Sequence, residues 1–140
     1  MFEKPNRITL AGSEYPLKCD FVVLEQVQEN YGDLTKFEEK IRKFVPDLDA
    51  KGMPVKNKDG LIVGHYDYPD IKALLDFTYW CICEGCEIEA VEMPADRKAL
   101  MRMIDMTPLE LSEIMHAEYV SAFARKNPQT TQEGTKARKA

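Results

Sequence analysis

Apolar and polar residues alternate along the first twenty residues, on both sides of a Gly-Ser pair at 12–13. Alternation with a period of two is typical of strands, and a glycine between two such runs is typical of a hairpin turn. Pro16 has no amide hydrogen to donate to a strand ladder, and a four-residue loop over 11–14 would turn its backbone outward. The sequence therefore predicts a β-hairpin with Leu10 opposite Tyr15.

The next apolar residues recur at helical spacing. Asp20 can cap a helix over 21–31, and Asp33 can cap a second helix over 34–44, which Pro46 would end. We expect the apolar residues of the first helix to belong to the scaffold of the fold: Phe21, Leu24, Val27 and Tyr31.

The segment 46–69 is rich in proline and glycine and interrupts the helical pattern. The run Asn-Lys-Asp-Gly at 57–60 lies between two short apolar runs, 53–55 and 61–63, and has the composition of a turn. Because both arms carry little apolar surface, we expect a second β-hairpin near 53–66 that projects from the body as an insertion.

A third helical pattern begins after Asp70 and is apolar around most of its circumference. We expect it to be the central, most buried helix and to end near Gly85. A brief extended piece over 88–91 and a short helix over 94–104 follow. The run Thr-Pro-Leu-Glu at 107–110 is a capping box with proline at the first helical position. The helix that it opens should face the core with Leu111, Ile114, Met115, Tyr119, Ala122 and Phe123.

These patterns predict a single globular domain over 1–126 of the α+β class, predominantly helical. An N-terminal β-hairpin is followed by about five helices, with the second hairpin inserted near 53–66. The polar residues 127–140 have nothing to bury, and we expect them to form a disordered tail.

Charge is distributed unevenly along the 140 residues, whose formal net charge is −5. Residues 125–140 hold five Lys and Arg against one Glu, which gives +4 and leaves −9 for residues 1–124. An acidic body disfavours nucleic acid as the main partner, because phosphate contacts need a basic face. The basic end could contact nucleic acid weakly or fold back on the body, although short charged ends are usually just solvated.

Nothing in the sequence indicates a membrane span or a secretory signal, since the longest apolar run is far shorter than the ~20 residues that a bilayer needs. We therefore expect a cytoplasmic protein without a membrane partner, in which the four cysteines are thiols.

Three closely spaced cysteines, Cys81, Cys83 and Cys86, are the candidate metal-ligating or redox residues. On a helix, Cys81 and Cys83 would lie about 200° apart and face opposite ways. A second CxxC pair is missing, so a tetrahedral zinc site would have to be completed from Cys19, His65 and His116. We interpret the cysteines as small apolar residues packed in a buried helix.

No other catalytic constellation is recognisable. The run at 60–64, Gly-Leu-Ile-Val-Gly, lacks the Lys-Ser/Thr pair of a phosphate loop, and no serine stands in a nucleophile-elbow motif. His65 and His116 have no ligand-spaced partner. We expect no catalytic residues, no cofactor and no small-molecule substrate, and hence a protein that is not an enzyme.

Three segments resemble tail assembly chaperones of long-tailed (siphovirus-type) phages and prophages: RITLAGSEYPLKCDF, VLEQVQENYGDLTKFEEKI and LLDFTYWCICEGCEIEA. Members begin with a short element similar to Ile-Thr-Leu-Gly-Gly-Lys-Glu-Tyr-Pro-Leu and continue with two helices. The likeness spans about residues 7–124 and is strongest in the N-terminal third. Its matching residues are Ile8, Leu10, Gly12, Glu14, Tyr15, Leu17, Phe21, Tyr31, Gly32, Phe37 and Glu38.

The resemblance implies a non-enzymatic chaperone that acts during phage tail morphogenesis. Such a protein binds the tape measure protein, keeps its long hydrophobic helices soluble and helps to recruit tail tube subunits. It would work in the host cytoplasm and be absent from the mature virion. The resemblance does not locate the partner-binding residues, and self-association stays open.

Two alternatives remain at this point. One is another structural phage tail protein, such as a completion or connector subunit. The other, from a different class, is a small metal-binding or redox protein that uses Cys81, Cys83 and Cys86.

Overall fold

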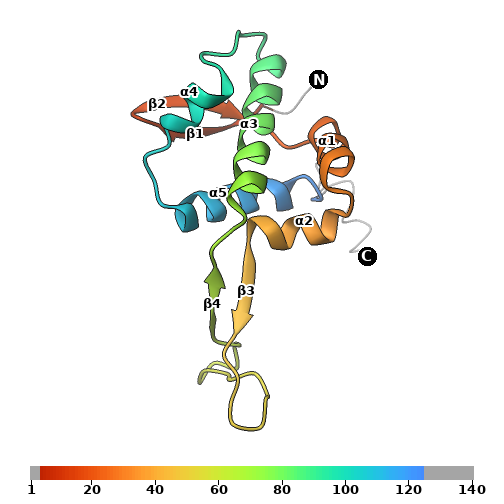
Figure 1. Ribbon diagram of the computed structural model, residues 1–140, viewed down its shortest axis with the longest axis vertical. Helices are drawn as coiled ribbons and strands as arrows, with labels where there is room; N and C mark the ends of the chain where they lie inside the picture. Colours follow the sequence, from red (N-terminus) through yellow and green to blue (C-terminus); the bar gives the residue numbers. More distant parts are fainter. Residues whose placement is uncertain (1–3, 125–140) are drawn as a thin grey trace, which may run out of the picture.

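Helix α3 (Ile71–Ile88) runs through the centre of the structure and contacts strand β2 (Ser13–Leu17) and the four other helices (Figure 1). The computed structural model describes residues 4–124. The other elements of this body are β1 (Asn6–Leu10), α1 (Phe21–Tyr31), α2 (Leu34–Ile41), α4 (Arg97–Arg102) and α5 (Pro108–Ser121). A separate pair of strands, β3 (Lys43–Pro46) and β4 (Gly64–Asp67), extends away from it.

The expected α+β architecture with an N-terminal hairpin, five helices and a second hairpin is therefore confirmed for the described residues. The tail predicted at 127–140 lies outside them.

The N-terminal hairpin is closed by a two-residue turn, so the four-residue loop predicted from Pro16 is wrong. Leu10 pairs with Ser13, and both turn residues at 11–12 have positive φ, as a type I′ turn requires. Hydrogen-bonded and non-hydrogen-bonded pairs alternate outward from this closing pair. Pro16, opposite Arg7, consequently occupies a non-hydrogen-bonded position, where its missing amide hydrogen has no cost.

Gly85 lies inside α3 and does not end it, contrary to the sequence-based expectation. A Cβ atom at this position would lie 2.7 Å from the carbonyl carbon of Pro16 and 2.9 Å from the amide nitrogen of Leu17. The glycine thus allows the backbones of α3 and β2 to approach closely. One turn earlier, the carbonyl of Cys81 accepts a hydrogen bond of 3.0 Å from the amide of Lys18, which fixes the end of the hairpin on the helix.

The predictions for two short segments after α3 are also wrong. Ile88 is the last residue of α3 and leads into a turn, so no extended piece forms at 88–91. The helix expected over 94–104 is shorter and spans Arg97–Arg102. It starts later than expected because the side chain of Asp96 accepts a hydrogen bond from the amide of Ala99 and caps α4. The capping box at the start of α5 is confirmed, with reciprocal hydrogen bonds between Thr107 and Glu110.

Helix α2 ends at Ile41, and the chain turns into strand β3 where the sequence predicted further helix. Phe44 and Val45 continue the apolar spacing of the helix, but they pair with Tyr66 and His65 on β4. Aromatic stacking stabilises this pairing, since the rings of Phe44 and Tyr66 lie 5.3 Å apart. The second hairpin is therefore longer than predicted.

We call residues 43–67 the finger. Its strands lead into two loops that project from the body, as Figure 1 shows. The predicted turn at 57–60 is present near its end, where Lys56 and Ile62 form an isolated bridge. The expected projecting insertion is thus confirmed, with strands that start closer to the body.

The core is centred on three aromatic side chains, Phe37 of α2, Phe77 of α3 and Tyr119 of α5, all of them fully buried. Their ring centroids lie 5.5–5.8 Å apart in tilted and edge-on arrangements. The hydroxyl of Tyr119 donates a 2.7 Å hydrogen bond to the carbonyl of Leu34 at the start of α2. A second polar contact orients the same two helices: the buried hydroxyl of Ser112 in α5 donates a hydrogen bond to the carbonyl of Ile41 in α2.

A buried carboxylate joins α5 to the N-terminal segment. Glu118 accepts a 2.7 Å hydrogen bond from the side chain of Asn6 and a 2.9 Å hydrogen bond from the amide of Cys19. Buried polar groups in native structures are hydrogen bonded, and both carboxyl oxygens of Glu118 have a donor. The hairpin is therefore tied to α5 as well as to α3.

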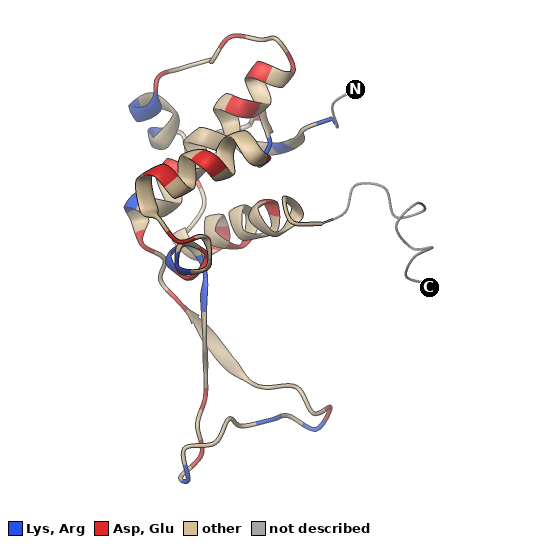
Figure 2. Cartoon of the chain, turned by 90° about the vertical axis from the view of Figure 1, so that its right-hand side faces the viewer, with Lys and Arg blue, Asp and Glu red and all other residues tan. Residues whose placement is uncertain are grey.

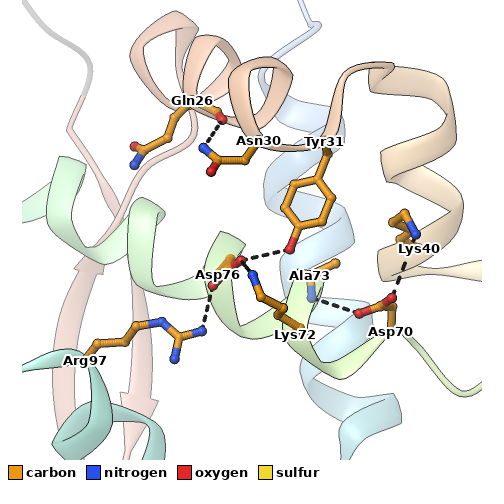
Figure 3. A network of polar contacts seen from close by, with 9 residues as sticks. All are labelled: Gln26, Asn30, Tyr31, Lys40, Asp70, Lys72, Ala73, Asp76 and Arg97. Carbon is orange, nitrogen blue, oxygen red and sulfur yellow. Dashed lines mark hydrogen bonds and ion pairs between the residues drawn. The ribbon is translucent and has the colours of Figure 1, made fainter.

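A second carboxylate, Asp76 of α3, joins α1 and α4 to the central helix (Figure 3). It accepts hydrogen bonds from the hydroxyl of Tyr31 at 2.8 Å, from Lys72 at 2.8 Å and from Arg97 at 2.7 Å. Burial alone would raise the pKa of Asp76, but these three donors outweigh it and hold the pKa below its usual value. Three donors on one carboxylate give Asp76 a structural role.

Candidate protein-binding groove

An open cavity lies where the N-terminal half of α1 faces the start of α2 and the end of α5. Its volume is about 540 Å³. It is lined by Phe21, Val22, Leu24, Glu25, Gln28, Leu34 and Phe123. A concave, mainly apolar surface between helices suits the apolar face of another helix.

Phe21 is 83% exposed and lines this cavity, so its predicted place in the scaffold is wrong. The buried side of α1 is made by Val23, Leu24 and Val27. At 100° per residue, Phe21 points well away from the Val23–Val27 side. The side chain of Asp20 fixes this helix start by accepting hydrogen bonds from the amides of Val22 and Val23.

Phe123 was also expected to face the core, but it is 56% exposed. Its ring lies 5.2 Å from that of Tyr119, edge-on, and so rests against the last buried aromatic residue of α5. It borders a second cavity of about 320 Å³, lined by Leu34, Thr35, Glu38, Tyr119 and Phe123. Because both cavities share Leu34 and Phe123, they form one surface, which we call the α1–α5 groove.

Among residues 4–124, the charged side chains that line the α1–α5 groove are the carboxylates Glu25 and Glu38. Glu29 follows Glu25 by one helical turn and is exposed on the same side of α1. Glu38 contacts His116, with Oε2 and Nε2 2.8 Å apart. The basic residue Lys40 of α2 lies near Asp70, at 3.8 Å, on the opposite flank of the helix.

A further apolar cavity of about 210 Å³, separate from the α1–α5 groove, lies between the first half of α3 and the start of α5. It is lined by Ile71, Leu74, Leu75, Met101, Ile104, Met106, Thr107, Pro108 and Leu111. Met101, Met103 and Met106 are partly buried and pack against the core.

The end of the finger carries exposed apolar side chains on two loops that share one hydrogen-bond pattern. Asp49 and Asn57 each accept hydrogen bonds from the amides two and four residues later. Each loop contains a glycine with φ of +81°, Gly52 or Gly60. The loops expose Leu48, Met53, Leu61 and Ile62. Figure 2 shows charges of both signs at this end, whereas acidic residues recur along the helices of the body.

The candidate metal ligands lie on α3 but do not converge. Cys81 and Cys86 are buried in the core, whereas Cys83 is partly exposed. Burial and a hydrogen bond with Cys19 raise the pKa of the Cys81 thiol, so the reactive thiolate is disfavoured. Over residues 4–124, no group of three or more His, Cys, Asp and Glu is arranged to hold a metal ion.

The histidines lie apart from the cysteines. His65 is on the finger near Asp47 and Asp67, at 3.9 and 3.7 Å, and His116 contacts Glu38. The structure therefore does not bring His65 and His116 together with Cys81, Cys83 and Cys86.

Comparisons with protein-family models, with curated proteins and with solved structures find no match for the chain. Among the helices of residues 4–124, none has the length and apolar character needed to cross a membrane. Sequence reasoning missed the α1–α5 groove because Phe21 and Phe123 fit the apolar stripes of their helices. The signal that could have revealed it is the excess of apolar positions on α1, which has more than one helix face can bury.

Proposed function

We propose that this protein is a non-enzymatic assembly chaperone that holds an apolar helical segment of a partner in the α1–α5 groove. By its resemblance to tail assembly chaperones, the partner is the tape measure protein of a long-tailed phage. The protein would also help to recruit tail tube subunits. It would act in the host cytoplasm and be left out of the mature virion.

The exposed position of Phe21 is the observation that carries this proposal. A phenylalanine that is 83% exposed beside an apolar cavity gains free energy when a partner covers it. Val22 and Phe123 add two more exposed apolar side chains at the same groove. Contiguous apolar patches of this kind mark interaction sites in soluble proteins.

The resemblance supports the choice of partner. The matching residues Ile8, Leu10, Leu17 and Phe37 are buried, so the likeness concerns a scaffold. That scaffold presents α1 and α2, the two helices that form most of the groove. Phe21, which also matches, is the residue of the motif that lies open to a partner.

Co-expression with the tape measure protein encoded nearest to this gene tests the proposal. The tape measure protein should stay in the soluble fraction and copurify with the wild-type protein. It should precipitate when Phe21→Ser and Phe123→Ser are combined. Val91→Ser is the matched control, because Val91 is 50% exposed on the connection between α3 and α4. Loss of solubility with the control alone, or no copurification with the wild type, would contradict the proposal.

A further inference from the structure

We propose that the α1–α5 groove selects a helix whose apolar stripe is flanked by Lys and Arg. This inference rests on the proposed function and names the chemistry of the segment that the groove accepts. The charged residues around the groove are separate from the apolar residues on which the proposed function rests.

Helix α1 contains no basic residue, and its charged side chains are Glu25 and Glu29. They stand one turn apart and therefore lie on one side of the helix. Glu25 lines the groove beside Phe21 and Gln28. A helix laid across Phe21 would thus pass two carboxylates on the α1 side.

Glu38 places a carboxylate on the other side of the groove. The Lys residues of α2 do not neutralise this side, because at 100° per residue Lys36 and Lys40 fall on the opposite flank from Leu34 and Glu38. Lys40 lies close to Asp70 on that flank. Within residues 4–124, the side chain paired with Glu38 is that of His116, with Nε2 and Oε2 2.8 Å apart.

The two sides together give an apolar floor between acidic rims. Basic side chains that flank the apolar stripe of a partner helix would lie over both rims, and acidic ones would be repelled. The net charge of −9 for residues 1–124 strengthens this preference at longer range. The acidic residues 1–124 of a second copy would meet the groove with unfavourable charge.

Two designed amphipathic peptides of about twenty residues test the inference. Both have the same Leu-Ala stripe, and their flanking positions are all Lys in one and all Glu in the other. Fluorescence anisotropy with the full-length protein measures the two dissociation constants. The Lys peptide should bind at least about fivefold more tightly at low salt, and the difference should shrink at high salt.

A charge-reversed protein, Glu25→Lys with Glu29→Lys, should lose or reverse this preference. The control reverses two exposed glutamates away from the groove, Glu14→Lys with Glu92→Lys, and changes the net charge equally. The control should keep the preference for the Lys peptide. Circular dichroism checks that both variants are folded.

Equal binding of both peptides would overturn the inference and leave the proposed function standing. An equal loss of preference in the control would also overturn it, because net charge would then explain the effect. If neither peptide binds and Phe21→Ser dissociates a dimer, the groove is an interface between copies, and both the inference and the proposed function are wrong.

Discussion

Phe21, which follows the N-terminal hairpin, and Phe123, near the C-terminal end of the described residues, line the same cavity. One begins α1 and the other follows α5, and each is more than half exposed. Their neighbours Leu24 and Tyr119 are buried, so the two rings stand at the boundary between the core and solvent. This position makes them available to a partner at little cost to the fold.

The difference between a core phenylalanine and a groove phenylalanine can be measured. Phe37→Ala should reduce the free energy of unfolding by about 3–5 kcal/mol, because it leaves a cavity beside Phe77 and Tyr119. Phe123→Ala makes the same chemical change at an exposed site and should cost less than about 1 kcal/mol. Urea denaturation of both variants gives the comparison. Similar losses would mean that the Phe123 ring is part of the core.

Gly85→Ala should destabilise the protein, although alanine is normally the better helix residue. The added Cβ would meet the backbone of Pro16 and Leu17 at less than 3 Å and force β2 away from α3. We expect a loss of about 1–3 kcal/mol in the free energy of unfolding. Urea denaturation again provides the measurement, and an increase in stability would show that the contact is not close.

Glu84 should make stability decrease as pH rises from about 4 to about 7. Burial, a hydrogen bond with Asp20 and the charge of Asp20 raise the pKa of Glu84 to about 7. In the unfolded chain this pKa is about 4.3, so the folded state binds the proton more tightly. The resulting stabilisation is complete below about pH 4 and is lost as pH rises to about 7 and beyond.

Glu84→Gln removes this titration. The variant should match the wild type near pH 4 and exceed it by about 1 kcal/mol at pH 8, a figure that allows for solvent screening of a partly exposed group. Thermal unfolding at both pH values tests this, with Glu92→Gln as an exposed control. If the stability of the variant differs from that of the wild type by the same amount at both pH values, the pKa of Glu84 is not raised.

The far end of the finger should be dispensable for folding. The amide of Asp47 donates to the carbonyl of Val63 at 2.9 Å, so these two residues can close a shorter hairpin. Replacing 48–62 with Asn-Gly supplies the two-residue turn that such a pair accepts. Because the removed apolar side chains are exposed, the free energy of unfolding should change by less than about 0.5 kcal/mol. A loss above 1 kcal/mol would reveal packing against the body.

The sequence predicts local features of this fold well, because each depends on a few neighbouring residues. Asp20, Asp33 and Asp70 all accept hydrogen bonds from amides at the helix starts where they were expected. The hairpin register was missed because it depends on Ala11 adopting a φ of 51°, which is uncommon for a residue other than glycine.

Features that depend on distant packing were not predictable from the pattern. Phe44 has the spacing for a helix and the residue type for a strand, and its contact with Tyr66 decides between them. Likewise, α1 offers more apolar positions than one face can bury, and packing against α3 determines that Phe21 is left open. The groove therefore becomes visible only in the assembled fold.

An NMR titration tests the central claim most directly. The 15N-labelled protein would be mixed with helical segments of the tape measure protein, and amide shift changes mapped onto the structure. Binding in the α1–α5 groove predicts changes clustered at 21–28, at 34–38 and around Phe123, with 48–62 unaffected. Changes confined to the finger or to the cavity between α3 and α5, or no changes at all, would contradict it.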